Sequence, residues 1–171
     1  MKTVRIETPI AAPVEVVWDV MTDLPRYGEW NPFITSIEGE LQPGAQLRVT
    51  FELPGRKPRT LTPTVTAIEP ERRISWLGRL WLPGLVDAAH SLQITIGESG
   101  PVFVHREDFR GVLIPALGGV LRDTHTAFAA MNSALVERTT GMAERVVEGE
   151  AAGGRHHGRT GLGRRWGCSK P

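Results

Sequence analysis

Alternating apolar and polar positions open the chain, and a helical pattern follows them. Residues 3–10 alternate with a period of two, which is typical of a half-buried β-strand. Pro13 then stands where a helix would begin, because its fixed φ suits the first helical turn. The next apolar positions recur at helical spacing: Val14, Val17, Trp18 and Met21. The pattern therefore predicts a strand and an amphipathic helix, with a second short helical turn that ends near Trp30.

Six further segments carry strand patterns, and turn residues separate them. These segments cover residues 33–41, 47–53, 60–68, 73–78, 90–96 and 103–109. Most of the turns between them are marked by Gly and Pro: Gln42-Pro43-Gly44, Pro54-Gly55, Glu69-Pro70-Glu71 and Gly97-Glu98-Ser99-Gly100. Because short turns join consecutive strands, the pattern favours an antiparallel sheet.

The period changes after Gly111, where a long helix is expected. One stripe recurs at alternating spacings of three and four: Ile114, Leu117, Leu121, Thr124, Phe128, Met131 and Leu135. It predicts a helix of about 25–30 residues, or about 40 Å. The helical signal fades between Gly141 and Gly149. The economical packing is α+β, with a curved antiparallel sheet wrapped around this helix and a gap between them that suits a ligand.

Composition sets the broad class of the chain. Its 171 residues are enough for one domain with a sizeable core, and 40% are apolar. No segment approaches the ~20 apolar residues of a membrane span, and the first residues lack the apolar stretch of a signal peptide. The single cysteine, Cys168, excludes an internal disulfide and offers no metal cluster. We therefore expect a cytoplasmic protein without a metal or another cofactor.

Charge is distributed unevenly between the main part of the chain and its end. Residues 1–150 contain 15 Lys and Arg against all 19 Asp and Glu, a net charge of −4, which argues against nucleic-acid binding. Residues 149–171 are rich in Gly, Arg and His and show no periodicity. We expect residues 1–148 to form one domain and residues 149–171 to be a disordered basic tail. The oligomeric state is left open.

Several segments resemble a known superfamily. They include Glu29-Trp30-Asn31-Pro32-Phe33, Met131-Asn132-Ser133-Ala134-Leu135, residues 10–18, 69–76 and 107–113, and Pro83-Gly84-Leu85 with His90 downstream. They are similar to the SRPBCC superfamily, with its START-like helix-grip fold, and to its polyketide-cyclase/dehydrase-like branch. The resemblance extends over about residues 3–140. It implies a curved antiparallel sheet of about seven strands around a long C-terminal helix, with two short helices after the first strand. The superfamily includes enzymes, lipid carriers, hormone receptors and chaperone-like modules, so the resemblance does not select an activity.

The sequence contains no strong catalytic signature, but two polar residues fall on the expected cavity face. In the predicted strand phases His90 and Glu107 both point to the cavity, where an imidazole and a carboxylate can relay protons. The alternative, which we favour, is that each satisfies a neighbouring polar group or orients a ligand. His105 shares the face of Glu107 but lies near the hairpin turn, so we expect it at the rim.

Aromatic side chains are concentrated between Tyr27 and Phe33, where the short helix meets the sheet. The residues that we expect to line a ligand cavity are Trp30, Phe33, Phe51, Trp76, Trp81, His90, Phe109, Leu117, Leu121 and Phe128. Plain core packing is the alternative for the large aromatics, and it is favoured for Trp18 and Phe128. Phe33 is expected on the cavity wall, Trp30 in a partly structural role, and Trp81 in a loop over the mouth.

Three functions fit these patterns. The leading hypothesis is binding of a small hydrophobic or amphipathic molecule between the sheet and the long helix. The second is a cyclase or dehydratase in which His90 or Glu107 moves a proton. The third is a protein-interaction module that uses the outer face of the sheet, but the outer positions are polar. The basic clusters Arg72-Arg73 and Arg56-Lys57-Pro58-Arg59 are expected to be solvated faces.

Overall fold

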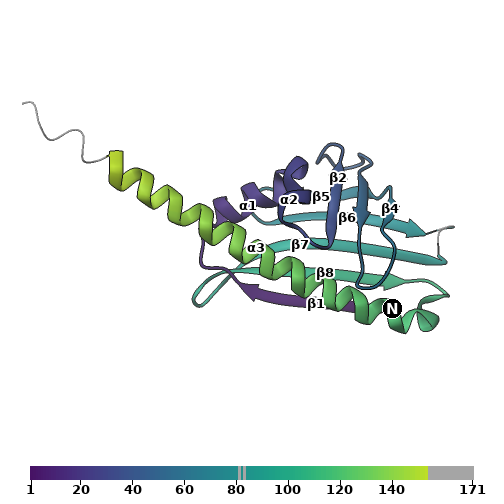
Figure 1. Cartoon of the computed structure of the whole chain (residues 1–171). Helices are drawn as coiled ribbons and strands as arrows, with labels where there is room; N and C mark the ends of the chain where they lie inside the picture. Colours follow the sequence, from purple (N-terminus) through teal and green to yellow (C-terminus); the bar gives the residue numbers. More distant parts are fainter. Residues whose placement is uncertain (81, 83, 154–171) are drawn as a thin grey trace, which may run out of the picture.

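The computed structural model describes residues 1–80, 82 and 84–153. Short helices follow the first strand, and a long helix follows the last one (Figure 1). In chain order the elements are β1 (Lys2–Pro9), α1 (Val14–Thr22), the 3-10 helix η1 (Leu24–Arg26), α2 (Tyr27–Trp30), β2 (Ile34–Glu38), β3 (Arg48–Phe51), β4 (Arg59–Leu61), β5 (Thr64–Glu69), β6 (Arg73–Leu80), β7 (Val86–Gly97), β8 (Gly100–Arg110), the 3-10 helix η2 (Ile114–Leu117) and α3 (Gly118–Gly153).

The strands form two antiparallel sheets. The larger sheet has the order β1-β8-β7-β6-β5, and the smaller one has the order β2-β3-β4. The predicted antiparallel α+β architecture is confirmed, but the expected strand over residues 60–68 is divided into β4 and β5. Pro63 lies at the division and has no N–H to donate to a ladder, which explains the break. An isolated bridge between Gln46 and Thr64 joins the two sheets.

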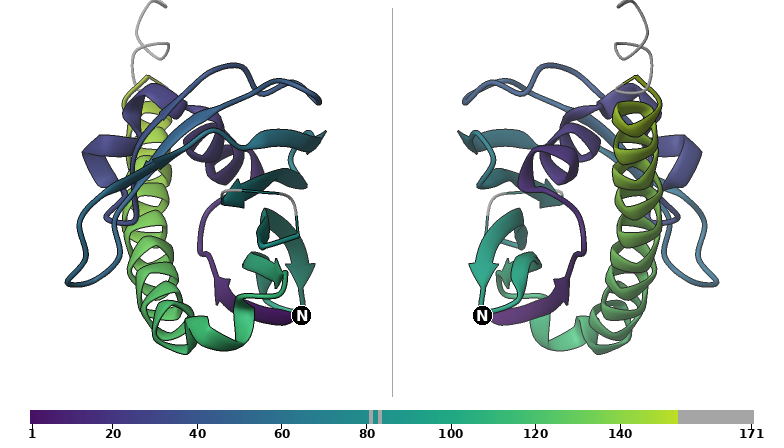
Figure 2. Two further views of the ribbon diagram at one scale, coloured as in Figure 1. Left: turned by 90° about the vertical axis from the view of Figure 1, so that its right-hand side faces the viewer. Right: turned by 90° about the vertical axis from the view of Figure 1, so that its left-hand side faces the viewer.

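The long helix α3 runs along one side of the sheets. The views turned by 90° show that the sheets curve around it (Figure 2). The predicted stripe faces the core: Ile114, Thr124, Phe128, Met131 and Leu135 are buried, and Leu117 and Leu121 are half-buried. The helix continues to Gly153, beyond the expected domain boundary at residue 148. Good helix formers such as Ala143 and Glu144 explain how it extends past the end of the stripe. The rest of the expected tail, residues 154–171, lies outside the described residues.

A buried amide organises the corner between α2 and β2. Asn31 is only 3% exposed, and its Oδ1 accepts hydrogen bonds from the backbone N–H groups of Phe33, at 2.9 Å, and Ile34, at 2.8 Å. The Tyr27 hydroxyl donates to the carbonyl oxygen of Met21 at 2.8 Å. These bonds hold the turn after α2, so the side chain of Phe33 is directed into the core.

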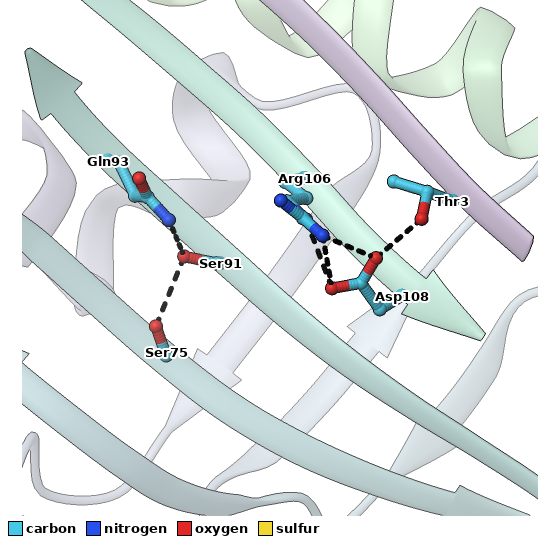
Figure 3. Close-up of polar contacts among 6 residues, drawn as sticks. All are labelled: Thr3, Ser75, Ser91, Gln93, Arg106 and Asp108. Carbon is cyan, nitrogen blue, oxygen red and sulfur yellow. Dashed lines mark hydrogen bonds and ion pairs between the residues drawn. The ribbon is translucent and has the colours of Figure 1, made fainter. Parts of the chain in front are cut away.

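The outer face of the larger sheet is polar, as the alternation predicts. Two groups of hydrogen-bonded side chains cross neighbouring strands there (Figure 3). The first joins Ser75, Ser91 and Gln93, and the second joins Thr3, Asp108 and Arg106. This polar face gives no support to the hypothesis of an apolar interaction surface on the outside of the sheet. None of the helices in the described residues is long and apolar enough to cross a bilayer.

The end of β8 provides a test of the fold. Gly111 has a φ of 129°, and a Cβ atom built on it would lie 2.3 Å from the carbonyl oxygen of Leu85. We expect Gly111→Ala to lower the free energy of unfolding by about 3 kcal/mol, because strain at φ and a backbone clash add together. Gly44→Ala is the control, since Gly44 also has a positive φ but has no atom within 4 Å of the added Cβ.

Urea unfolding of both variants measures the difference. Gly44→Ala should cost about 1 kcal/mol, the cost of the left-handed conformation alone. Equal losses in the two variants would contradict the close approach at Gly111.

Candidate functional site

A cavity of about 590 Å³ lies between the smaller sheet, the concave face of the larger sheet and the start of α3. Most of its wall is apolar. The lining residues are Phe33, Ile34, Val49, Phe51, Leu53, Arg56, Lys57, Arg59, Leu61, Pro63, Trp76, Gly78, Val86, Ala88, His90, Glu107, Phe109, Leu117, Val120 and Thr124. Small-molecule sites in proteins typically measure about 300–1,000 Å³, so the cavity has the size of a ligand site.

Six of the expected lining residues belong to this wall: Phe33, Phe51, Trp76, His90, Phe109 and Leu117. The structure places three others elsewhere. Trp30 packs on Tyr27 with 5.2 Å between ring centroids and borders a separate small hollow of about 70 Å³. Leu121 is half-buried against the core, and Phe128 is fully buried within it. Trp81 lies outside the described residues, so its role over the mouth stays a prediction.

A row of three side chains crosses the larger sheet at the cavity wall. Strand register pairs Trp76 on β6 with His90 on β7, and His90 with Glu107 on β8. The Trp76 and His90 rings stack, with centroids 4.6 Å apart and an interplanar angle of 9°. Nδ1 of His90 lies 3.6 Å from Oε1 of Glu107. The two polar candidates from the sequence therefore lie side by side, with the carboxylate on the cavity wall.

Behind this row, a second histidine continues the polar chain into the core. Nε2 of His105 lies 3.1 Å from Nε2 of His90, and its Nδ1 lies 2.9 Å from Oδ1 of Asn132 on α3. The Asn132 amide in turn donates to the hydroxyl of Thr8 on β1 at 2.9 Å. The prediction that His105 lies at the rim is wrong, because the residue is fully buried and its ring stacks on Phe128. A continuous set of polar contacts thus links Glu107 at the cavity to Thr8 on the edge strand β1.

The hydrogen-bond partners determine where the protons of this chain lie. With the Asn132 carbonyl toward His105, Nδ1 of His105 carries the proton and its Nε2 accepts from His90. A neutral His90 then presents the lone pair of Nδ1 to Glu107, so this contact is favourable only when a proton lies between them. Turning the Asn132 amide by 180° reverses every donor and acceptor, and the Nδ1–H of His90 then points to the Glu107 carboxylate, 3.6 Å away. The chain can therefore hold a proton at the cavity wall or deliver one there.

His105 itself remains neutral in the folded protein. Burial, and next the charge of His90, hold the pKa of its imidazole well below the usual range, although the hydrogen bond with Asn132 opposes them. Within this polar chain, His90 and Glu107 are the titratable groups that line the cavity.

Comparison with known proteins identifies the family. The sequence matches, over residues 1–160, the family described as polyketide cyclase / dehydrase and lipid transport. The chain belongs to this family. The match confirms the resemblance to the polyketide-cyclase/dehydrase-like branch of the SRPBCC superfamily. No curated protein sequence matches the chain significantly.

Solved structures share the fold of this family member. The di-domain ARO/CYC BexL from the BE-7585A biosynthetic pathway aligns with a TM-score of 0.65 and 17% identity, over 81% of this chain and 50% of BexL. DynU16, a putative protein in the dynemicin biosynthetic locus, gives 0.62 and 18%, over 80% and 46%. Ms6760 from Mycobacterium smegmatis gives 0.65 and 16%, over 82% and 92%. The chain spans about half the length of BexL and DynU16, and identities this low show the helix-grip fold alone.

Sequence reasoning missed the roles of His105 and Asn132 in this family domain. His105 shares the period-two face of Phe103 and Phe109, and Asn132 stands next to Met131 on the buried side of α3. A polar residue on each of two apolar faces that pack together is the available signal, because buried polar groups need partners. The described residues contain no group of three His, Cys, Asp or Glu side chains placed to hold a metal ion.

The neutral His105 makes folding stability depend on pH. The unfolded chain takes up a proton near the ordinary histidine pKa of about 6.5, whereas buried His105 does not. The free energy of unfolding should therefore fall as pH drops from 7.5 to 5.5, by up to about 1.4 kcal/mol per pH unit below 6.5. His90 contacts the His105 ring directly, and Glu107 lies next to His90.

Urea unfolding at several pH values tests this dependence. His105→Gln should flatten the slope, although its stability at pH 7.5 will be lower. His125→Gln, which changes an exposed histidine on α3, is the matched control and should keep the parental slope. An unchanged slope in His105→Gln would contradict a neutral buried imidazole.

Proposed function

We propose that the protein binds a small hydrophobic or amphipathic ligand in the cavity between its sheets and α3. The observation that carries this proposal is a space of about 590 Å³ with a mainly apolar wall. Each Å² of apolar ligand surface removed from water contributes roughly 25 cal/mol, so such a wall favours a hydrophobic occupant. Lipid transport is part of the description of the family, which agrees with this choice.

The polar part of the wall orients such a ligand. Glu107 and His90 form one group, and Thr124 on α3 also lines the cavity. A hydroxyl group of the ligand placed beside Glu107 would donate a hydrogen bond to the carboxylate, which an apolar neighbour leaves unmade. The ligand that fits best is therefore mainly apolar and carries an oxygen at the end that reaches this row.

Two neighbouring alanines on β7 provide a matched test. Ala88 lines the cavity, whereas Ala89 is exposed on the opposite face of the strand. Ala88→Trp should fill the cavity and weaken binding of the neutral dye Nile red at least tenfold, as measured by fluorescence titration. Ala89→Trp should bind like the parent, with circular dichroism confirming that both variants are folded. Absence of binding in the parent, or equal losses in both variants, would refute a ligand site in this cavity.

A second candidate function is catalysis of the cyclase or dehydratase type. The specific observation is the Glu107–His90 pair, 3.6 Å apart at the wall of an apolar cavity. In a dehydration, the pair would take a proton from a carbon next to a carbonyl and return it to the hydroxyl group, which leaves as water. A cavity that holds the reacting chain in one conformation contributes further through positioning.

Replacing both members of the pair tests this candidate. In an enzyme, Glu107→Gln combined with His90→Gln should lower turnover of a 3-hydroxyacyl N-acetylcysteamine thioester at least 100-fold, while Nile red still binds. Glu98→Gln, in the exposed turn between β7 and β8, is the control and should retain full turnover. Product formation followed by mass spectrometry distinguishes the outcomes, and turnover that survives the double replacement excludes this mechanism.

A further inference from the structure

The mouth of the cavity is basic although the main part of the chain is acidic. Arg56, Lys57 and Arg59 all contribute to the lining, whereas Glu107 is the acidic residue among the lining side chains. Residues 1–150 carry a net charge of −4, so this concentration of cations is against the general trend. The sequence suggested a solvated surface cluster at these positions. Because these three residues line the cavity, the cluster can contact a ligand.

Strand register explains why Arg59 faces the ligand space. Arg59 on β4 pairs with Phe51 on β3, and Phe51 belongs to the cavity wall. The next pair, Thr50 with Thr60, alternates to the other face, where the two hydroxyls bond at 2.8 Å. Arg59 therefore shares the cavity face of the smaller sheet, and its aliphatic stem extends the apolar wall while its guanidinium reaches solvent.

The three cations are not equivalent. Arg56 is occupied, because its Nε donates to Oδ2 of Asp123 on α3 at 2.7 Å. This ion pair joins the loop between β3 and β4 to the helix across the mouth. The ion pairs found among the described side chains include neither Lys57 nor Arg59. Two positive charges at the mouth thus remain available to a ligand.

We propose that the cavity selects amphiphiles with an anionic head, a carboxylate or a phosphate monoester, which Lys57 and Arg59 bind at the mouth. This inference rests on the proposed function and names the ligand class of the same site. A planar guanidinium matches both kinds of anion, and the ammonium group adds a mobile second charge. The Phe51 ring lies 6.0 Å from the Phe33 ring, centroid to centroid, and the Phe33 ring lies 6.3 Å from that of His90. The two phenylalanines lie between Arg59 and His90 and provide apolar surface for the hydrocarbon chain of the ligand. The free cations lie at the mouth, whereas Glu107, the acidic residue of the lining, lies on the inner wall, so the head stays at the mouth and the ligand has one orientation.

Four amphiphiles of equal chain length test the head group. Dodecanoate, dodecyl phosphate, dodecanol and dodecylamine each compete with bound Nile red at pH 8, below their micelle concentrations. Either anion should bind at least tenfold more tightly than dodecanol, and dodecylamine should bind most weakly. Raising the salt from 50 to 500 mM should reduce the preference for the anions, because exposed charges are screened. The stronger of the two anions identifies the natural head as carboxylate or phosphate.

Variants of the mouth assign this preference to residues. The double variant Lys57→Gln, Arg59→Gln should bring the affinity for the anions to within about threefold of that for dodecanol, with dodecanol itself unchanged. Arg48→Gln is the matched control, because Arg48 is an exposed cation on β3 outside the cavity lining, and it should keep the full preference. A preference that survives in the double variant would overturn the assignment to Lys57 and Arg59.

The head-group inference and the proposed function can fail separately. If dodecanol and the anions compete equally while Ala88→Trp still weakens Nile red binding, the head-group inference is wrong and the cavity remains a ligand site. If Nile red does not bind the parent protein, the proposed function fails, and the inference fails with it.

Discussion

The buried hydrogen-bond chain from His90 through His105 and Asn132 to Thr8 is the constraint on which the rest of the site depends. It joins β7, β8, α3 and β1 in one line of contacts. His90, His105 and Asn132 are buried, so loss of a partner would leave an unsatisfied donor or acceptor at a cost of about 1–3 kcal/mol, whereas Thr8 is half-buried. The chain therefore determines how closely the middle of α3 approaches the larger sheet. It also positions His90, and through His90 the neighbouring carboxylate.

The cavity exists because this close approach does not extend along the whole helix. In its middle turns α3 contributes Phe128, Met131 and Leu135, which are fully buried against the sheets. Toward its start the helix offers Val120 and Thr124, which are too small to reach the opposite wall. The ion pair between Arg56 and Asp123 joins the loop between β3 and β4 to α3 at the surface. The space behind this ion pair is not filled by side chains and forms the cavity. The middle of the helix thus stabilises the fold, and its first turns border the ligand space.

Periodicity in the sequence was sufficient to predict the fold class, the antiparallel strands and the long helix, since each element has one apolar face. It did not reveal the division at Pro63, because a mixed Thr and Val composition hides a local break. His105 was misplaced because its nearness to a turn was given more weight than its strand phase. Trp30 and Phe33 differ in environment although they are close in sequence, because the Asn31 side chain directs the turn between them. The pairing of Arg59 with Phe51 across the β3–β4 hairpin, which places Arg59 beside the cavity, depends on the length of the turn and does not show in the alternation of either strand.

The bond between Asn132 and Thr8 also has a consequence for the order of folding. It spans 124 residues of sequence, and β1 pairs with β8, from Lys2 with Phe109 to Pro9 with Val102. Contacts at such separation are formed late and slowly, because a long loop must close before they contribute. During synthesis β1 cannot pair with β8 until nearly the whole domain has left the ribosome. None of the described residues that line the cavity belongs to β1, so the lining strands can pair before the two ends of the domain meet.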